Sequence, residues 1–242
     1  MQKNGFSTAA YFNKHGVDGV FRIIIDNNIM CHREMASQIN SQVMANNFTT
    51  LDILDLGCGP AFHIAKSFYG ITPISYTGVD TSIESLKAAK NNISMMSNLT
   101  QSLFLNADFL DELARLVEKK VHYDLVLSSY AQHHLNIQKK KLFFELVYAV
   151  LKKNRAFFLI DMINPEKTKG AWLRIMKEYM VNTGKFSSDM IEDSICHMSE
   201  SDFPENVGTL RELGASVGFK DNKVCYILPE KEKIYTFIRF FK

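Results

Sequence analysis

Short runs of apolar residues alternate with longer segments of helical periodicity through the middle of the chain. Five of these runs have the length of strands, and they cover residues 51–54, 74–79, 102–106, 123–129 and 156–160. Strands separated by helices pair in parallel, because the crossover between them is right-handed. The pattern therefore predicts an α/β domain with a parallel sheet over residues 51–163.

Turn signals frame the last three strands. Asn154 precedes the fifth strand, and we expect it to make the turn there because asparagine tolerates the left-handed region well. A helical segment, 206–217, ends at Gly218. Two further strand-like runs, 219–228 and 233–240, are joined by a short connection and therefore form an antiparallel hairpin.

Residues 164–205 are too long for an ordinary connection after a strand. Apolar side chains recur within this segment at the spacing of one helix face, namely at Trp172, Ile175, Met176, Tyr179 and Met180. We expect an amphipathic helix with a broad apolar face. A pocket wall, a dimer contact and a core contact would each explain such a face.

A ligand-binding turn is indicated at residues 53–61, Ile-Leu-Asp-Leu-Gly-Cys-Gly-Pro-Ala. An apolar strand runs into Asp55, Gly57 and Gly59 follow, and a helix-compatible stretch comes next. Glycine permits positive φ angles and lets a ligand approach the backbone closely. The free N–H groups at the start of the following helix favour an anionic or polar group.

Two classes of cofactor protein use such a turn. The dinucleotide fingerprint G-x-G-x-x-G requires a third glycine, and Phe62 stands in its place. Asp55 is not part of that fingerprint either. A nicotinamide-dependent oxidoreductase is therefore the less favoured alternative.

The string Asp55-Leu56-Gly57-Cys58-Gly59-Pro60-Ala61 resembles motif I, D-x-G-x-G-x-G, of the class I S-adenosylmethionine-dependent methyltransferases. It departs from that motif only at Ala61. Asp80 ends the next strand, where a carboxylate can accept both ribose hydroxyls. Tyr130 to Leu135, with the pair His133-His134, resembles the family's motif IV region.

The resemblance implies a doubly wound, seven-stranded Rossmann-like sheet, mostly parallel, with an antiparallel C-terminal strand. It implies a helical N-terminal lid segment over residues 1–50, a methyltransferase domain over 51–242, and a lid or substrate insertion over 164–205. It also implies that Asp108 binds the adenine amino group and that Phe109 lies beside the ring. The cofactor-binding residues expected from it are Asp55, Gly57, Cys58, Gly59, Asp80, Thr81, Asp108, Phe109, Ser128 and Tyr11.

Each of these residues also has a plainer interpretation. Asp80 and Asp108 could act as helix caps, and Tyr11 and Phe12 could simply fasten the N-terminal segment to the sheet. Arg22 could pair with the cofactor carboxylate or lie at the surface.

The sulfonium of S-adenosylmethionine activates its own methyl group for transfer. The protein must therefore align the acceptor's nucleophile with that methyl group and exclude water. A base is needed only when the nucleophile carries a proton. His133 is the expected catalytic base, because histidine titrates near neutrality; the alternative is that its ring only hydrogen-bonds the loop. No metal is expected, because adjacent histidines point to opposite sides of an extended chain and lack a third ligand.

The composition of the chain limits the classes of partner and the compartment that we expect. The net charge of +2 gives no strong field toward nucleic acid or an acidic membrane, and no N/D-P-P-Y/F string follows the fourth strand. The four cysteines are scattered, without a C-x-x-C pair. No signal sequence or spanning helix is evident. We therefore expect a cytoplasmic enzyme with a small-molecule acceptor and with no nucleic-acid or membrane partner, which could form a homodimer. A non-catalytic cofactor-binding or partner-binding protein is the alternative.

Overall fold

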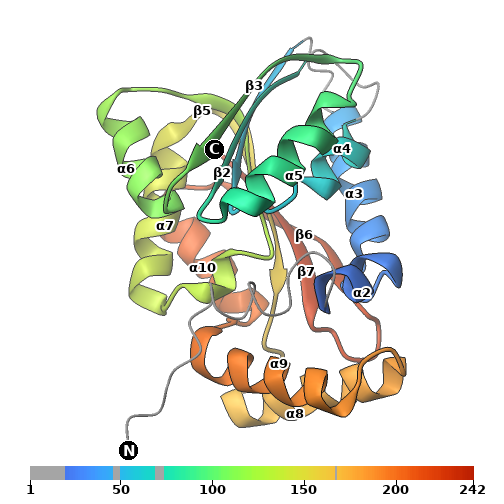
Figure 1. The fold of residues 1–242 in the computed structure, drawn as a ribbon. Helices are drawn as coiled ribbons and strands as arrows, with labels where there is room; N and C mark the ends of the chain where they lie inside the picture. Colours follow the sequence, from blue (N-terminus) through green and yellow to red (C-terminus); the bar gives the residue numbers. More distant parts are fainter. Residues whose placement is uncertain (1–19, 46–49, 69–73, 167) are drawn as a thin grey trace, which may run out of the picture.

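The computed structural model describes residues 20–45, 50–68, 74–166 and 168–242 (Figure 1). The strands are β1 (Leu51–Leu56), β2 (Ile74–Asp80), β3 (Leu99–Asn106), β4 (Tyr123–Ser129), β5 (Leu151–Met162), β6 (Asp221–Leu228) and β7 (Tyr235–Phe241). The helices are α2 (Val20–Asp26), α3 (His32–Met44), α4 (Phe62–Ser67), α5 (Ile83–Ser94), α6 (Phe109–Glu118), the 3₁₀ turn η1 (Gln132–His134), α7 (Ile137–Val150), α8 (Lys169–Thr183), α9 (Ser188–Ser201) and α10 (Val207–Val217).

The strands form one sheet in the order β3-β2-β1-β4-β5-β7-β6. Neighbours among β1 to β5 are parallel, whereas β7 runs antiparallel to both β5 and β6. The predicted doubly wound, mostly parallel sheet with an antiparallel C-terminal strand is thus confirmed. The strand order reverses between β1 and β4, which is where open α/β sheets hold their ligands.

The strand limits differ from the prediction mainly at β5. This strand begins at Leu151 and contains Asn154, whose φ of 59° is the left-handed conformation expected for it. The pairing of β4 with β5 shifts its register between Tyr123 and Leu125. The turn predicted before the strand is therefore an irregularity within it.

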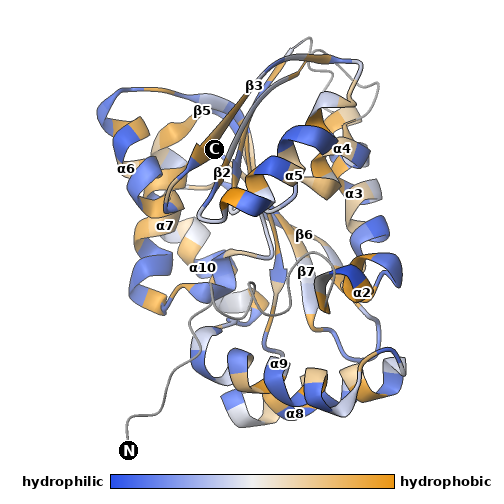
Figure 2. Cartoon of the chain, in the orientation of Figure 1, coloured by the Kyte–Doolittle hydropathy of each residue, from blue (hydrophilic) through white to orange (hydrophobic). Residues whose placement is uncertain are grey.

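Two apolar layers enclose the sheet. Alternate residues of β1, such as Ile53 and Leu54, enter opposite layers. Helices α3, α4 and α5 cover one face, and α6, α7 and α10 cover the other (Figure 1). Figure 2 shows hydrophobic and hydrophilic residues alternating along these helices, as expected for helices with one buried side.

The N-terminal segment contributes a core helix. In α3, Met35, Ile39 and Val43 are buried in the same layer as α4 and α5. The part of residues 1–50 that the structure describes is therefore packed against the sheet, and a lid over the cofactor stays a prediction for this segment. None of the described helices has the length and apolarity to span a membrane.

The insertion over residues 164–205 forms two helices, α8, which is the expected amphipathic helix, and α9, for which the apolar pattern makes no prediction. They lie side by side beyond the end of β5 (Figure 1). Trp172, Met176 and Met180 are buried on the predicted apolar face, and the first two join the core with Tyr235 of β7. The apolar face of α8 is therefore a core contact.

We expect Trp172→Ala to lower the free energy of unfolding by about 3–5 kcal/mol, because a fully buried ring would leave a cavity. Urea unfolding measures the change. Val181→Ala, on the exposed side of the same helix, should stay within about 0.5 kcal/mol of wild type. A loss below about 1 kcal/mol for Trp172→Ala would mean that α8 is not part of the folded core.

Candidate functional site

The glycine turn lies where the strand order reverses. Gly57 and Gly59 have φ angles of +68° and +51°, and Ala61 takes the left-handed conformation at 52° despite its side chain. The Gly57 N–H donates to the carbonyl of Val79 at 2.9 Å, which fastens the turn to β2. A Cβ on Gly57 would lie 2.4 Å from the Cβ of Ala131, so the turn and the loop after β4 approach each other closely.

Asp80 ends β2 with its carboxylate directed at the glycine turn. One oxygen accepts the Gly59 N–H at 2.8 Å, and the other accepts the Ser82 N–H at 2.8 Å. The Asn106 side chain at the end of β3 donates to the carbonyls of Asp80 and Thr81. Asp80 therefore joins the ends of three neighbouring strands, and Thr81 beside it is exposed.

Asp108 and Phe109 follow β3. Asp108 is exposed and caps α6, because its Oδ1 accepts the Leu110 N–H at 2.8 Å. The plainer interpretation of Asp108 as a helix cap is thus observed. Phe109 meets Phe143 edge to face at 5.7 Å between ring centres, and its ring lies 3.9 Å from the position of a Cβ on Gly57. Phe109 therefore borders the glycine turn.

Asp55 and Ser128 each lie one residue before the end of their strands, the adjacent β1 and β4, and both are buried. The Tyr76 hydroxyl donates to one oxygen of Asp55 at 2.9 Å, while the other oxygen and the Ser128 hydroxyl have no hydrogen-bond partner among the residues that the structure describes. Burial raises the pKa of Asp55 to about 7. Burial, with the nearby Asp55 and Asp80 carboxylates, raises the pKa of Cys58, so its thiol is neutral and unreactive.

Two tyrosine side chains bind the segment that precedes α3, and one of them belongs to the loop after β4. The Tyr130 hydroxyl donates to the carbonyl of Met30, and the Tyr179 hydroxyl of α8 donates to that of Ile29 at 2.6 Å. Tyr235 of β7 contacts both tyrosine rings edge to face. Tyr130 begins the string that resembles motif IV, but no sequence signal indicates the contacts with residues 29 and 30.

His133 is held by Asp161 at the end of β5. One oxygen of Asp161 accepts the His133 backbone N–H at 2.9 Å, and the other lies 2.5 Å from its Nδ1. Burial disfavours the charged imidazole, but Asp161 and Asp202 outweigh that effect and raise the pKa of His133. Both ring nitrogens of His133 therefore face carboxylates in a site that is almost closed to solvent.

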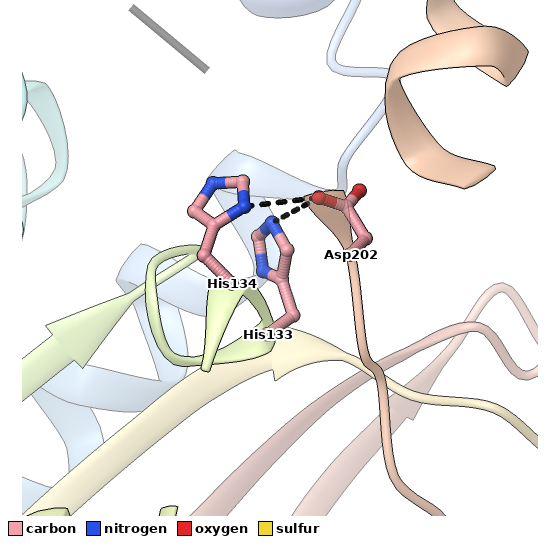
Figure 3. A group of neighbouring side chains, drawn as sticks. All are labelled: His133, His134 and Asp202. Carbon is pink, nitrogen blue, oxygen red and sulfur yellow. Dashed lines mark ion pairs between the residues drawn. The ribbon is translucent and has the colours of Figure 1, made fainter. Parts of the chain in front are cut away.

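His133 and His134 turn their rings to the same side, contrary to the expectation for adjacent histidines. They lie in η1 rather than in an extended chain, and their ring centres are 4.1 Å apart. Both rings approach one oxygen of Asp202, which follows α9 (Figure 3). The distances to this oxygen are 3.9 Å from His133 Nε2 and 2.9 Å from His134 Nδ1.

The end of the insertion is fastened to this loop by backbone and side-chain contacts. The Phe203 N–H donates to the carbonyl of His133 at 2.7 Å. Lys140 of α7 is fully buried, and its ammonium donates to the carbonyls of Leu135 and Phe203. Burial lowers the pKa of Lys140 to about 8. Residues 202 and 203 therefore belong to the same structural unit as the loop after β4.

Phe62 does not fill the turn between the strand ends. It lines an open hollow of about 290 Å³ beside α2 and α3, and the Lys66 ammonium lies 4.1 Å from its ring centre. The other residues of this hollow are Ile25, Asp26, His32 and Arg33.

The structure brings most of the predicted residues to one edge of the sheet. Those at the ends of β1 to β4 are Asp55, Gly57, Cys58, Gly59, Asp80, Thr81, Asp108, Phe109 and Ser128. Tyr11 and Phe12 lie outside the described residues. Asp202 was not anticipated, because no local pattern connects it with the histidine pair.

A family model for a methyltransferase domain matches residues 47–240. Among solved structures, the chain resembles magnesium protoporphyrin IX methyltransferase (ChlM) from Synechocystis PCC 6803 with bound SAH, at 16% identity and a TM-score of 0.63, over 96% of each chain. It also resembles an O-methyltransferase family protein from Burkholderia thailandensis, at 13% identity and a TM-score of 0.63, over 98% of this chain and 60% of that one. No curated protein sequence matches significantly. The chain spans less than two thirds of the length of several solved structures that share its fold.

The ionisation of Asp55 gives a prediction for stability. Because the pKa of Asp55 is about 7 in the fold, the folded protein keeps a proton that the unfolded chain releases above its ordinary pKa of 3.8. Asp55 therefore lowers the free energy of unfolding as pH rises from about 4 to about 7, by at most roughly 4 kcal/mol.

Urea unfolding of wild type and Asp55→Asn across this range measures the effect. The asparagine variant cannot ionise, so the difference between the two proteins isolates Asp55 from all other titrating groups. We expect wild type to lose stability relative to the variant as pH rises. A difference that does not change with pH would show that Asp55 is not desolvated in the fold.

Proposed function

Because the chain belongs to the family of methyltransferase domains, we propose that it is a class I enzyme that transfers a methyl group from S-adenosylmethionine to a small molecule. The observation that carries this proposal is the junction of Asp80 with the glycine turn. The Asp80 carboxylate contacts the Gly59 N–H at the point where the sheet order reverses. A ribose bound there would reach both a carboxylate acceptor and a backbone donor.

The unsatisfied polar atoms fit the methionine end of this cofactor. Within the described ranges of the chain, Asp55 has a buried oxygen without a hydrogen-bond partner, and the Ser128 hydroxyl on the adjacent strand has none either. An ammonium group supplies the donors that these two acceptors lack. The binding of this cation would also favour the ionised form of Asp55, whose pKa burial has raised.

The adenine end is proposed to lie between the glycine turn and α6. Phe109 borders the turn and offers an aromatic face or edge to a base. Asp108 uses one oxygen as the helix cap, and an adenine amino group would use the other. Cys58 and Thr81 complete the walls of this site. Tyr11 is proposed to contact the methionine end.

The acceptor of the methyl group is proposed to be a small molecule, with oxygen, nitrogen or carbon as its nucleophilic atom. The sulfonium supplies the methyl group, and the protein would align the acceptor and exclude water. His133 as a catalytic base stays a prediction. Its Nδ1 contacts Asp161 and its side chain is 5% exposed, so the ring could serve an acceptor only after the loop or the insertion moves.

The remaining expectations concern the setting of the enzyme. We propose no nucleic-acid partner, because the net charge is only +2. We also propose a cytoplasmic location, because the four cysteines are scattered without a C-x-x-C pair. A homodimer also stays a prediction.

Calorimetric titration with S-adenosylmethionine tests cofactor binding. Asp80→Ala should weaken binding by about 10- to 100-fold, because a hydrogen bond to a charged group contributes about 1.5–3 kcal/mol. Gly57→Val should abolish binding, because a side chain would collide with Ala131. Asp189→Ala, which removes an exposed carboxylate from α9, is the matched control and should bind like wild type. Circular dichroism verifies that each variant is folded. Wild type that gives no heat at millimolar cofactor would refute the proposal.

Turnover separates an enzyme from a non-catalytic binding protein. We expect S-adenosylhomocysteine to form from the cofactor in the presence of a panel of small alcohols, phenols, amines and carboxylic acids. Release of the product is measured by mass spectrometry. Cofactor binding that Asp80→Ala weakens as predicted, without turnover on any member of the panel, would favour the non-catalytic alternative.

A further inference from the structure

We propose that His133, His134 and Asp202 bind a divalent transition-metal ion, such as Zn²⁺, between the loop after β4 and the end of the insertion. The three side chains offer two imidazole nitrogens and one carboxylate oxygen, all within 4.8 Å of one another. This donor set is one that zinc and other first-row divalent ions accept. Figure 3 shows both rings directed at the same oxygen of Asp202.

The distances between the donor atoms are compatible with a bound ion. Ligand atoms about 2.1 Å from a tetrahedral zinc ion lie about 3.4 Å apart. The separations of 2.9 Å from His134 Nδ1 and 3.9 Å from His133 Nε2 to Asp202 Oδ1 lie on either side of that value. Small rotations of the side chains would therefore complete the coordination.

Asp161 prepares His133 as a ligand. Histidines that bind metal usually donate their second ring N–H to a carboxylate, which fixes the tautomer and the ring orientation. Here Nδ1 of His133 lies 2.5 Å from Asp161, and the backbone N–H of His133 binds the other oxygen of the same carboxylate. Nε2 is then the nitrogen left to face Asp202.

The polar atoms at the centre of the cluster are buried and poorly satisfied. His134 Nδ1 and Asp202 Oδ1 lie 2.9 Å apart as an ion pair, but within the described part of the chain neither atom makes a well-aligned hydrogen bond. Buried carboxylate oxygens without a partner are costly and rare. A proton on His133 would not satisfy Asp202, because 3.9 Å is too long for a hydrogen bond. A metal ion would satisfy both atoms at once.

The charges around the cluster accept a cation. Two buried carboxylates, those of Asp161 and Asp202, lie beside the histidine pair, and the buried Lys140 ammonium donates to the carbonyls of Leu135 and Phe203. His197 of α9 adds a third imidazole, with Nε2 3.8 Å from the same Asp202 oxygen. The His134 side chain is 24% exposed, which gives an ion a path from solvent and room for a water ligand.

Such an ion would join segments that are distant in the sequence. His133 and His134 follow β4, close to Ala131 and the glycine turn, whereas Asp202 ends the insertion. Because the ion would occupy Nε2 of His133, metal binding and a role of this ring as a catalytic base exclude each other.

Calorimetry with ZnCl₂, after treatment of the full chain with a chelator, tests the proposal without any cofactor. We expect one Zn²⁺ per chain. Asp202→Asn and His134→Ala should each weaken binding by more than about 100-fold, beyond the loss typical of residues that only support ligands. His122→Ala, which removes an exposed histidine outside the cluster, is the matched control and should bind like wild type.

Thermal unfolding gives the second measurement. Zn²⁺ should raise the melting temperature of wild type and of His122→Ala, but not that of Asp202→Asn, because only a ligand bound to the native site stabilises the fold. If Asp202→Asn does not fold, His134→Ala decides, because its side chain lies partly at the surface. Wild type that binds no Zn²⁺, or binding that survives both substitutions, would overturn the proposal.

Discussion

The buried carboxylate of Asp161 determines the conformation of the loop after β4. It receives the backbone N–H groups of His133 and Met162 and lies against the His133 ring. Burial of a charge is tolerable only with such partners. Because the carboxylate binds backbone as well as side chain, it fixes where β4 ends and how η1 begins. The position of His134, and of everything that packs on η1, follows from this contact.

The same loop connects three parts of the chain. The Tyr130 hydroxyl donates a hydrogen bond to the carbonyl of Met30, which holds the segment before α3 against this loop. Phe203 binds the backbone of His133, so the insertion is fixed from it as well. On its other side, Ala131 lies against Gly57. A change in the loop would therefore reach the glycine turn, the N-terminal segment and the insertion together.

Much of the fold could be predicted because its signals are local. Apolar runs mark the strands. The turn from Asp55 to Ala61 contains two glycines in the sequence, and both adopt the positive φ angles that glycine permits. Asn154 at positive φ is a local signal of the same kind. These features depend on neighbouring residues only, so periodicity and residue type were sufficient.

The remaining features depend on residues that the fold brings together. Asp202 meets the histidine pair only because α8 and α9 return the chain to the loop after β4. The histidines share one side because η1 is a 3₁₀ turn, which neither side chain specifies. Asp108 shows a different limit of prediction from sequence. An aspartate that caps a helix and an aspartate that binds a ligand look identical in sequence.

Three carboxylates in this region are buried to a similar degree but are satisfied to different extents. Asp161 has backbone donors for both oxygens, whereas, among the residues that the structure describes, Asp55 keeps one oxygen without a hydrogen bond and one oxygen of Asp202 is directed at imidazole rings. A carboxylate that serves only the fold can be fully satisfied, as Asp161 demonstrates. An unsatisfied one lowers stability and is expected where a bound group provides the missing partner. The two open oxygens face different surroundings: the glycine turn beside Asp55, and two imidazoles beside Asp202. They therefore call for different partners, an ammonium group in the first case and a metal ion in the second.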